Sequence, residues 1–262
     1  MKKKTILVAA IAVMLVAALV VGGTLAYFTD KSDAKVNTFT VGNVAIDLEE
    51  PNWKADGSHT LLPGVSYAKD PTITVEKGSQ DAYVFLKLDL NKYVSLINLM
   101  GVDAYKYFDD LKDQTYPGFI EFVDMLAKDN ALRAKVLDRW FVGINHADWK
   151  VMNREQIMTD VAAAKDGKNP AHLVVVLGYK GGENAGVVSA GTAIKFMTAF
   201  GMPSTVTASM FDGKDAYRID GVSKSNFNTN SSDFKMTFTA YAVQANTLTL
   251  DTAYEALGDI TK

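Results

Sequence analysis

The N-terminal stretch limits which part of this chain can belong to a folded domain. Lysines at positions 2–4 precede a run of seventeen residues, Thr5–Val21, that carries no charge. The run is followed by small residues, among which Thr24 and Ala26 have the spacing that signal peptidase requires before its cleavage site. A basic start, an apolar middle and a small-residue end are typical of a secretory signal peptide. We therefore predict cleavage between Ala26 and Tyr27.

The alternative is that the apolar run stays in place as a membrane anchor. As a helix, the run would span about 26 Å, which is shorter than the ~30 Å of hydrocarbon in a bilayer. It also ends in Gly22-Gly23, without a positively charged flank. These features favour removal of residues 1–26, so that the chain contacts the membrane only through the signal peptide and only before cleavage.

Composition restricts the classes of partner and of chemistry. The mature chain has 236 residues (262 − 26), which suffices for one large domain or two small ones. Without the three N-terminal lysines, 24 basic (27 − 3) and 30 acidic residues remain, a net charge of about −6. This acidic balance argues against nucleic acid as a partner. The chain has no cysteine, which excludes disulfides, cysteine nucleophiles and cysteine-based zinc sites.

Strand patterns dominate the two ends of the mature chain. Alternating apolar residues and β-branched or aromatic content predict strands within Thr38–Leu48, Thr72–Val75, Ala82–Leu90, His172–Tyr179 and Phe234–Gln244. Pro63-Gly64 predicts a type II turn, because Pro fixes φ and Gly accepts a positive φ. A short helix is predicted at Leu250–Leu257.

The middle of the chain has helical spacing instead. Phe119, Phe122, Val123 and Leu126 recur at i, i+3, i+4 and i+7, which indicates an amphipathic helix. Strands on either side without βαβ alternation favour antiparallel sheets. The predicted fold class is therefore mainly β with a helical insertion (α+β), an antiparallel β-sandwich in a single domain at 38–262 with the insertion at about 91–167.

Several stretches resemble the TasA/camelysin family of secreted proteins of Gram-positive bacteria. GGTLAYFTD at 22–30 resembles the family's processing site and mature start, and Thr38–Leu48 follows the pattern TFxxGxxxIxL. Leu61–Lys87 follows a second family pattern, and FTAYAVQA at Phe238–Ala245 resembles the family's C-terminal end. The segment 91–167 matches no family motif. The resemblance implies a jelly-roll-like sandwich, a place in the biofilm matrix or on the cell surface, and processing by a signal peptidase of the SipW type.

The resemblance also implies assembly into fibres through donation of an N-terminal strand. The candidate donor segment covers 27–40 and includes Tyr27, Phe28, Thr29, Asp30 and Phe39. A free extended terminus can pair with the edge of a sheet in a neighbouring molecule, and such a heterologous contact propagates into a filament. We expect self-association into fibres or association with a related matrix protein, without a cofactor. The alternative, a flexible terminus on a monomer, stays open.

A second function implied by the resemblance is enzymatic, because camelysin is classed as a metalloprotease. Zinc catalysis needs about three His or carboxylate ligands around an open position, and the chain has no HExxH motif. Its three histidines, His59, His146 and His172, are only weak candidate ligands. We therefore predict no catalytic residue and no metal site.

A third possibility is a surface adhesin that binds a glycan or a host protein through the aromatic residues of the insertion. These residues are Tyr105, Tyr107, Phe108, Tyr116, Trp140, Phe141 and Trp149. The competing interpretation is that they form the core between the helices and the sandwich. Ligand binding that is lost on substitution of Trp140 or Trp149, without unfolding, would favour the adhesin.

Overall fold

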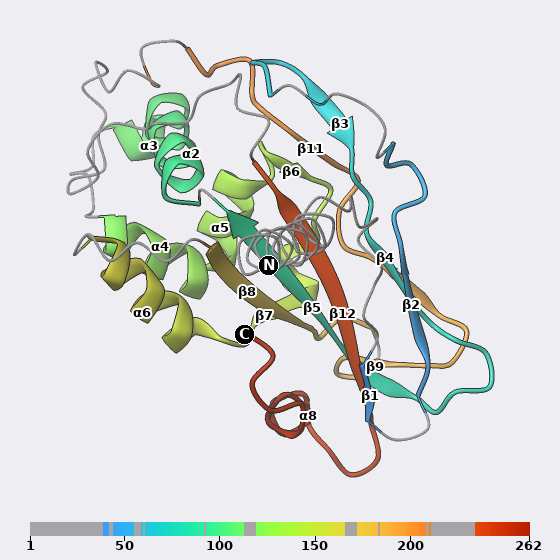
Figure 1. Cartoon of the computed structure of the whole chain (residues 1–262). Helices are drawn as coiled ribbons and strands as arrows, with labels where there is room; N and C mark the ends of the chain where they lie inside the picture. The colour runs from blue at the N-terminus through green and yellow to red at the C-terminus, as the bar shows by residue number, and fades with distance from the viewer. Residues whose placement is uncertain are drawn as a thin grey trace, which may run out of the picture. The chain divides into compact units, whose positions relative to one another are not determined.

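Three β-sheets and a group of helices make up the described part of the chain (Figure 1). The computed structural model describes residues 39–41, 44–54, 59, 61–91, 93–112, 119–165, 172–182, 184–207, 210 and 234–262. The strands are β1 (Phe39–Val41), β2 (Ile46–Glu49), β3 (Ser66–Ala68), β4 (Thr72–Val75), β5 (Ala82–Asn91), β6 (Phe141–Val142), β7 (Trp149–Val151), β8 (His172–Tyr179), β9 (Val187–Val188), β10 (Ala193–Lys195), β11 (Ala199–Gly201) and β12 (Met236–Gln244). The helices are α2 (Tyr93–Tyr107), α3 (Asp109–Lys112), α4 (Phe119–Lys128), α5 (Asn130–Leu137), the 3-10 helix η1 (His146–Asp148), α6 (Arg154–Lys165) and α8 (Leu250–Ala256).

Helices and strands hold similar shares of the described residues, so the fold is mixed α+β. The prediction of antiparallel sheets combined with helices is confirmed, but the prediction of a mainly β chain is wrong. The reason is the extent of the helices between β5 and β8. The predicted insertion also contributes strands that the helical spacing did not reveal, because β6 pairs with β11 and β7 pairs with β8.

The largest sheet is built around β5. Its strand order is β1-β12-β5-β8-β7, and β9 also pairs with β5. β12 runs antiparallel to β5 along its whole length, from Met236 opposite Leu90 to Gln244 opposite Ala82. β8 flanks the other side of β5 and is also antiparallel. Among the described strand pairs, only β1 and β12 are parallel.

Both faces of this sheet are buried around Tyr83–Leu86 of β5 and Tyr241–Val243 of β12. Because side chains alternate along a strand, Val84, Leu86 and Leu88 of β5 join the main hydrophobic core, whereas Tyr83 and Phe85 join a second, smaller core. Helix α8 covers the second core with Ala253 and Tyr254, and the Tyr254 ring lies 5.8 Å from the Phe85 ring. Its N-cap is Thr249, whose side chain accepts a hydrogen bond from the Thr252 backbone N–H. The predicted C-terminal helix is thus present.

A three-stranded sheet, β10-β4-β2, shares the main core with the central sheet. Ile46 and Leu48 of β2 and Ile73 and Val75 of β4 are buried in the same cluster as Phe238 of β12. Another three-stranded sheet has the order β3-β11-β6. Smaller sheets therefore pack against part of the core-side face of the central sheet.

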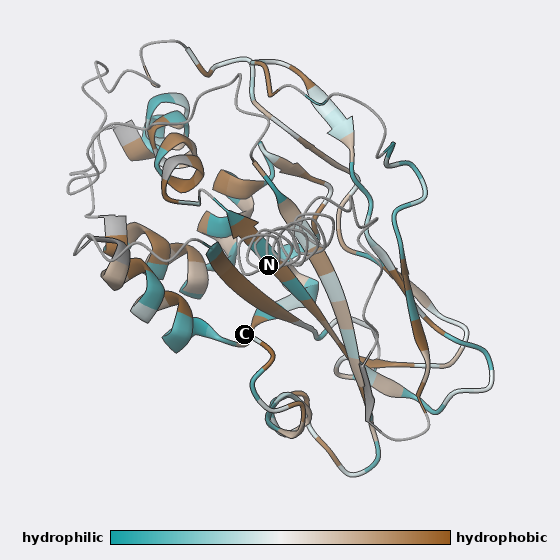
Figure 2. Cartoon of the chain, viewed as in Figure 1, coloured by the Kyte–Doolittle hydropathy of each residue, from teal (hydrophilic) through white to brown (hydrophobic). Residues whose placement is uncertain are grey.

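The helices cover another part of the core-side face. Phe122, Val123 and Leu126 of α4, the residues whose spacing predicts a helix, are buried in the main core together with Ile157 and Val161 of α6. These helices carry hydrophilic residues as well, whereas β8 is hydrophobic along most of its length (Figure 2). The amphipathic pattern thus places the helices between the sheet and solvent.

The predicted turn between β2 and β3 is confirmed in its details. Gly64 has φ +81°, and the Val65 backbone N–H donates to the Leu62 carbonyl over 3.1 Å. A bond between the first and fourth residues, with a positive φ at the third, is the geometry of a type II turn. Its sequence, Pro63-Gly64, follows from the fixed φ of Pro and the missing Cβ of Gly.

Residues Val36–Lys262 form one compact unit. Within the described ranges, no helix combines the length and the apolar character needed to cross a bilayer. The predicted signal peptide at 1–26 lies outside the described residues.

Candidate assembly site

The edge of the central sheet at β12 is the feature that matches the predicted mode of assembly. On one side, all nine residues of β12 pair with β5. On the other side, β1 pairs only with Tyr241, Ala242 and Val243 (Figure 1). Among the described residues, no strand lies beside Met236–Ala240 on this side. Such an edge presents backbone N–H and C=O groups to which an additional strand can bind.

The opposite edge of the sheet is closed by a side chain. Asn153, which is 6 % exposed, donates from Nδ2 to the Val174 carbonyl over 2.8 Å. Its Oδ1 accepts from the Val176 backbone N–H, also over 2.8 Å. Asn153 thus satisfies two backbone groups of β8 beyond the end of the short strand β7. The sheet is therefore asymmetric, with a closed edge at β8 and an open stretch at β12.

Side chains on the core side of β12 hold it in place. Phe238 is 6 % exposed, and the Lys69 Nζ lies 5.6 Å from the centre of its ring. Lys69 also lies 4.2 Å from the ring centre of Trp53 and forms a 2.7 Å ion pair with Glu50. A cation over aromatic faces is attracted by their quadrupoles. The segments that follow β2 and β3 therefore pack against the part of β12 that has an open edge.

Of the candidate donor residues Tyr27, Phe28, Thr29, Asp30 and Phe39, the structure describes Phe39. Ala26, Tyr27, Phe28, Thr29 and Asp30 lie outside the described residues. Phe39 is the first residue of β1 and lies opposite Tyr241 in the pairing with β12. The end of the predicted donor segment is therefore already at the sheet edge.

The three histidines lie in separate surroundings. The His59 ring stacks on Trp53 with 4.2 Å between ring centres and meets Tyr67 edge to face at 4.8 Å. His172, at the start of β8, contacts Asp89 of β5 through Nδ1 at 2.7 Å. Over the part of the chain that the structure describes, no group of three or more His, Asp or Glu side chains could hold a metal ion.

His146 is the buried histidine, with 6 % exposure. Its Nε2 lies 3.0 Å from Oδ1 of Asp138. Burial lowers the pKa of His146 because the charged imidazolium is poorly solvated, and Arg133 acts in the same direction, whereas Asp138 opposes the change. His146 therefore contributes to the packing of the helical region rather than to an exposed binding site.

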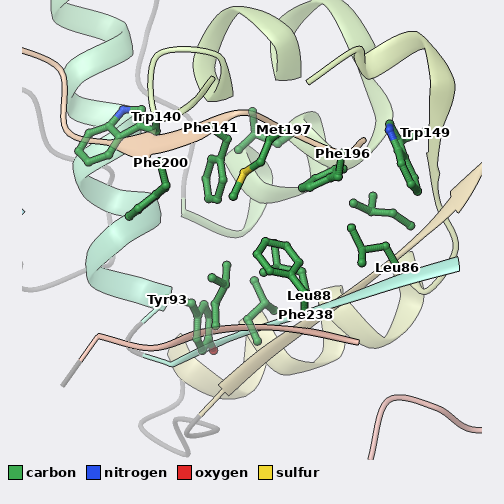
Figure 3. Packing of buried hydrophobic residues seen from close by; sticks show 14 of the residues in the cluster. Leu86, Leu88, Tyr93, Trp140, Phe141, Trp149, Phe196, Met197, Phe200 and Phe238 are labelled. Atoms are coloured by element: carbon green, nitrogen blue, oxygen red, sulfur yellow. The ribbon is translucent and has the colours of Figure 1, made fainter. Parts of the chain in front are cut away.

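The aromatic residues of the insertion mainly form core. Trp140, Phe141 and Trp149 are 0 %, 4 % and 3 % exposed, and Figure 3 shows them among the packed residues of the main cluster. Tyr105 is also buried, whereas Tyr107 is 51 % exposed. Tyr116 lies outside the described residues. The adhesin hypothesis is therefore wrong for Trp140 and Trp149, because neither side chain is accessible to a ligand.

Sequence reasoning did not identify Met236–Ala240 as an open edge or Asn153 as the residue that closes the other edge. The alternation in β12 predicts the strand but not which neighbours flank it. Asn after a strand and before a helix is read locally as a helix start, and its bonds to β8 depend on the tertiary fold. No local signal in the sequence indicates either role.

Comparison with known proteins identifies a family for the N-terminal third. The family model described as camelysin metallo-endopeptidase matches residues 1–87. No curated protein and no solved structure matches the chain. The matched stretch ends within β5, so the C-terminal likeness at Phe238–Ala245 lies beyond it. The match confirms, over residues 1–87, the relationship to the TasA/camelysin family that the sequence predicts.

Proposed function

We propose that this protein is a secreted, non-enzymatic structural component of the extracellular matrix or cell surface. In this proposal, it assembles into fibres when the N-terminal segment of one copy pairs with the β12 edge of the next. The family match supports a secreted matrix or protease-family protein. The predicted cleavage between Ala26 and Tyr27 would create the free terminus during export. A contact of this kind is heterologous and therefore continues from copy to copy.

The observation that carries the proposal is the difference in length between β1 and β12. β1 contributes three residues, whereas β12 has nine. In the parallel register that sets Phe39 opposite Tyr241, a donated segment that takes the place of β1 on the neighbouring copy would place its Ala34–Thr38 opposite Met236–Ala240. The predicted donor segment, 27–40, contains all of these residues. A donated strand would thus have the length and direction to complete the edge.

We also propose that the sheets belong to a jelly-roll-like sandwich. The support is the core that the central sheet shares with β10-β4-β2, which includes Ile73 of β4 and Phe238 of β12, together with the family match over residues 1–87. In a sandwich of this kind, adding a strand at the β12 edge would extend the central sheet without opening the core.

The first experiment uses the purified chain that begins at Tyr27. The protein is incubated at high concentration, imaged by negative-stain electron microscopy and analysed for bound metal. We expect filaments that contain no stoichiometric metal. Deletion of Tyr27–Val36 should abolish the filaments and leave the circular dichroism spectrum and the melting temperature unchanged. If the truncated protein still forms filaments, strand donation is wrong.

A matched pair of proline variants tests the register. Proline lacks a backbone N–H and is excluded from the interior of a sheet. Val36→Pro lies within the segment that would face β12, so it should prevent filament formation. Lys31→Pro lies five residues earlier, outside that segment, and should leave filaments intact. Equal behaviour of the two variants would refute the register.

The description of the matched family favours one alternative, a secreted metalloprotease. The metal analysis of the same sample distinguishes it from the structural proposal. A monomer that carries one zinc ion per chain and cleaves a protein substrate would replace our proposal. Substitution of His59, His146 or His172 would then identify the ligands by loss of zinc.

A further inference from the structure

A cavity of about 130 Å³ lies between the central sheet and the helices. Leu88 of β5 and Val175 of β8 line it from the sheet, and Met100 of α2, Val123 of α4 and Ile157 of α6 line it from the helices. Native interiors contain few voids larger than a water molecule. A cavity of this volume is large enough to hold a small molecule.

One wall of the cavity is aromatic. Trp149 and Phe196 both line it, and their rings meet edge to face with 5.3 Å between centres (Figure 3). Leu88, which Figure 3 also shows, lines the cavity as well. Walls made mostly of aromatic and aliphatic side chains offer dispersion contacts to an apolar guest.

The two ionisable side chains at the cavity already have partners. Arg133 donates from Nη1 to the carbonyls of Leu126 and Ala127, at 2.8 and 3.3 Å, and from Nη2 to Asn130 Oδ1. Its charge thus lies against carbonyls at the C-terminal end of α4, where the helix dipole is negative. His146 contacts Asp138, as described above, and burial lowers its pKa.

Water is a poor occupant of such a space. A buried water needs two to four polar partners. The buried side-chain N and O atoms that lack a hydrogen-bond partner, within the described ranges, belong to Glu50, Asn98, Trp140 and Arg154. None of these residues lines the cavity. The walls therefore offer a guest mainly van der Waals contacts.

We propose that this cavity is a binding site for a small, neutral, apolar molecule about the size of benzene, such as a compact aromatic or a short alkyl group. An engineered cavity of about 150 Å³ with Leu, Ile and Phe walls stays dry and binds benzene or xenon. The cavity described here has a similar size and wall chemistry. A charged ligand does not fit, because the Arg133 guanidinium already faces oxygen atoms of the protein and the buried His146 already contacts Asp138.

The test measures the binding of benzene and toluene to the chain from Tyr27 to Lys262. Binding is followed by the change in melting temperature in sealed capillaries and by chemical-shift changes of Val123, Val175 and Ile157 methyl groups. Both ligands should raise the melting temperature in a saturable manner. Sodium benzoate, which has the same ring and a negative charge, should not.

Matched variants locate the site. Ala127 lines the cavity, so Ala127→Leu adds three carbon atoms to the space and should weaken benzene binding at least about tenfold. Ala131→Leu makes the same change on the exposed face of α5 and should bind benzene like the parent chain. If Ala127→Leu does not fold, Val123→Ile makes a smaller reduction of the same volume and should weaken binding several-fold.

Three results would overturn the proposal. One is the absence of a saturable response to both benzene and toluene. Another is equal benzene affinity of Ala127→Leu and Ala131→Leu, which would place binding elsewhere. A third is tighter binding of benzoate than of benzene, which would make Arg133 the recognition group and the natural ligand an anion.

Discussion

Replacement of Asp103 by Asn tests the most deeply buried charge in the described structure. Asp103 is 0 % exposed and lies on α2. Arg139 donates to both carboxylate oxygens, from Nε over 2.8 Å and from Nη2 over 3.2 Å. Thr205 Oγ1 donates to Asp103 Oδ1 over 2.5 Å. The network ties α2 to the residues that follow α5 and β11, so it is a tertiary contact rather than a local one.

The expected loss of stability follows from the burial of both partners. Breaking a buried ion pair by neutralising one partner costs about 3–5 kcal/mol, because the remaining charge stays desolvated. The Arg139 side chain keeps 16 % exposure, and the Tyr107 ring centre lies 3.6 Å from its guanidinium carbon. These features favour the lower end, about 3 kcal/mol for Asp103→Asn. For a domain of this size, that loss lowers the melting temperature by about 6–12 °C.

The assay is urea unfolding followed by tryptophan fluorescence, since Trp140 next to Arg139 is fully buried. Asp110→Asn is the matched control. Asp110 pairs with Lys135 but its side chain is 64 % exposed, so its loss should cost no more than about 1 kcal/mol. Asp103→Leu combined with Arg139→Met should cost less than Asp103→Asn alone, because it leaves no unpaired charge. A loss below about 1 kcal/mol for Asp103→Asn would refute the reasoning.

Two further substitutions address the closed sheet edge and the buried histidine. Asn153→Ala removes two hydrogen bonds to β8. In the same urea assay, it should lower the free energy of unfolding by about 2–3 kcal/mol. An unchanged free energy of unfolding would mean that β8 does not need this side chain. Burial lowers the pKa of His146 below its ordinary value of 6.5, so the unfolded chain takes up the proton first as the pH falls. The free energy of unfolding should therefore decrease as the pH drops below about 6.5, until the folded imidazole is also protonated. His146→Gln should remove this part of the pH dependence, and an unchanged profile would contradict the assignment.

The sequence predicts those elements whose pattern is local. The alternation at Phe234–Gln244 and the aromatic and branched content of Ala82–Leu90 indicate strands, and β12 and β5 lie there. The spacing of Phe119, Phe122, Val123 and Leu126 predicts α4 in the same way. In each case the periodicity follows from an element with one face in the core, so it can be read without knowledge of the neighbours.

The features that depend on tertiary neighbours are not predictable in this way. β6 and β7 are two and three residues long, too short for a period to show, and they exist only because β11 and β8 supply partners. The open stretch at Met236–Ala240 and the apolar cavity likewise depend on which elements of the fold lie next to a segment, and its own sequence does not show this. Pattern reasoning assigns Trp149 to an aromatic cluster but cannot decide between core and surface, and burial decides for core.

The boundary of the family match has a structural consequence. Within the first 87 residues, β2 and β4 pair with each other, but β1 pairs with β12, β3 with β11, and β5 with β12 and β8. β4 also needs β10 as its second neighbour. The described strands of the matched stretch therefore depend on later strands to satisfy their backbone groups. The segments beyond it, for which no comparison offers a precedent, supply both β12, the strand with the open edge, and the helices around the cavity. Any function that the family match over residues 1–87 does not account for is accordingly expected to depend on the residues after Lys87.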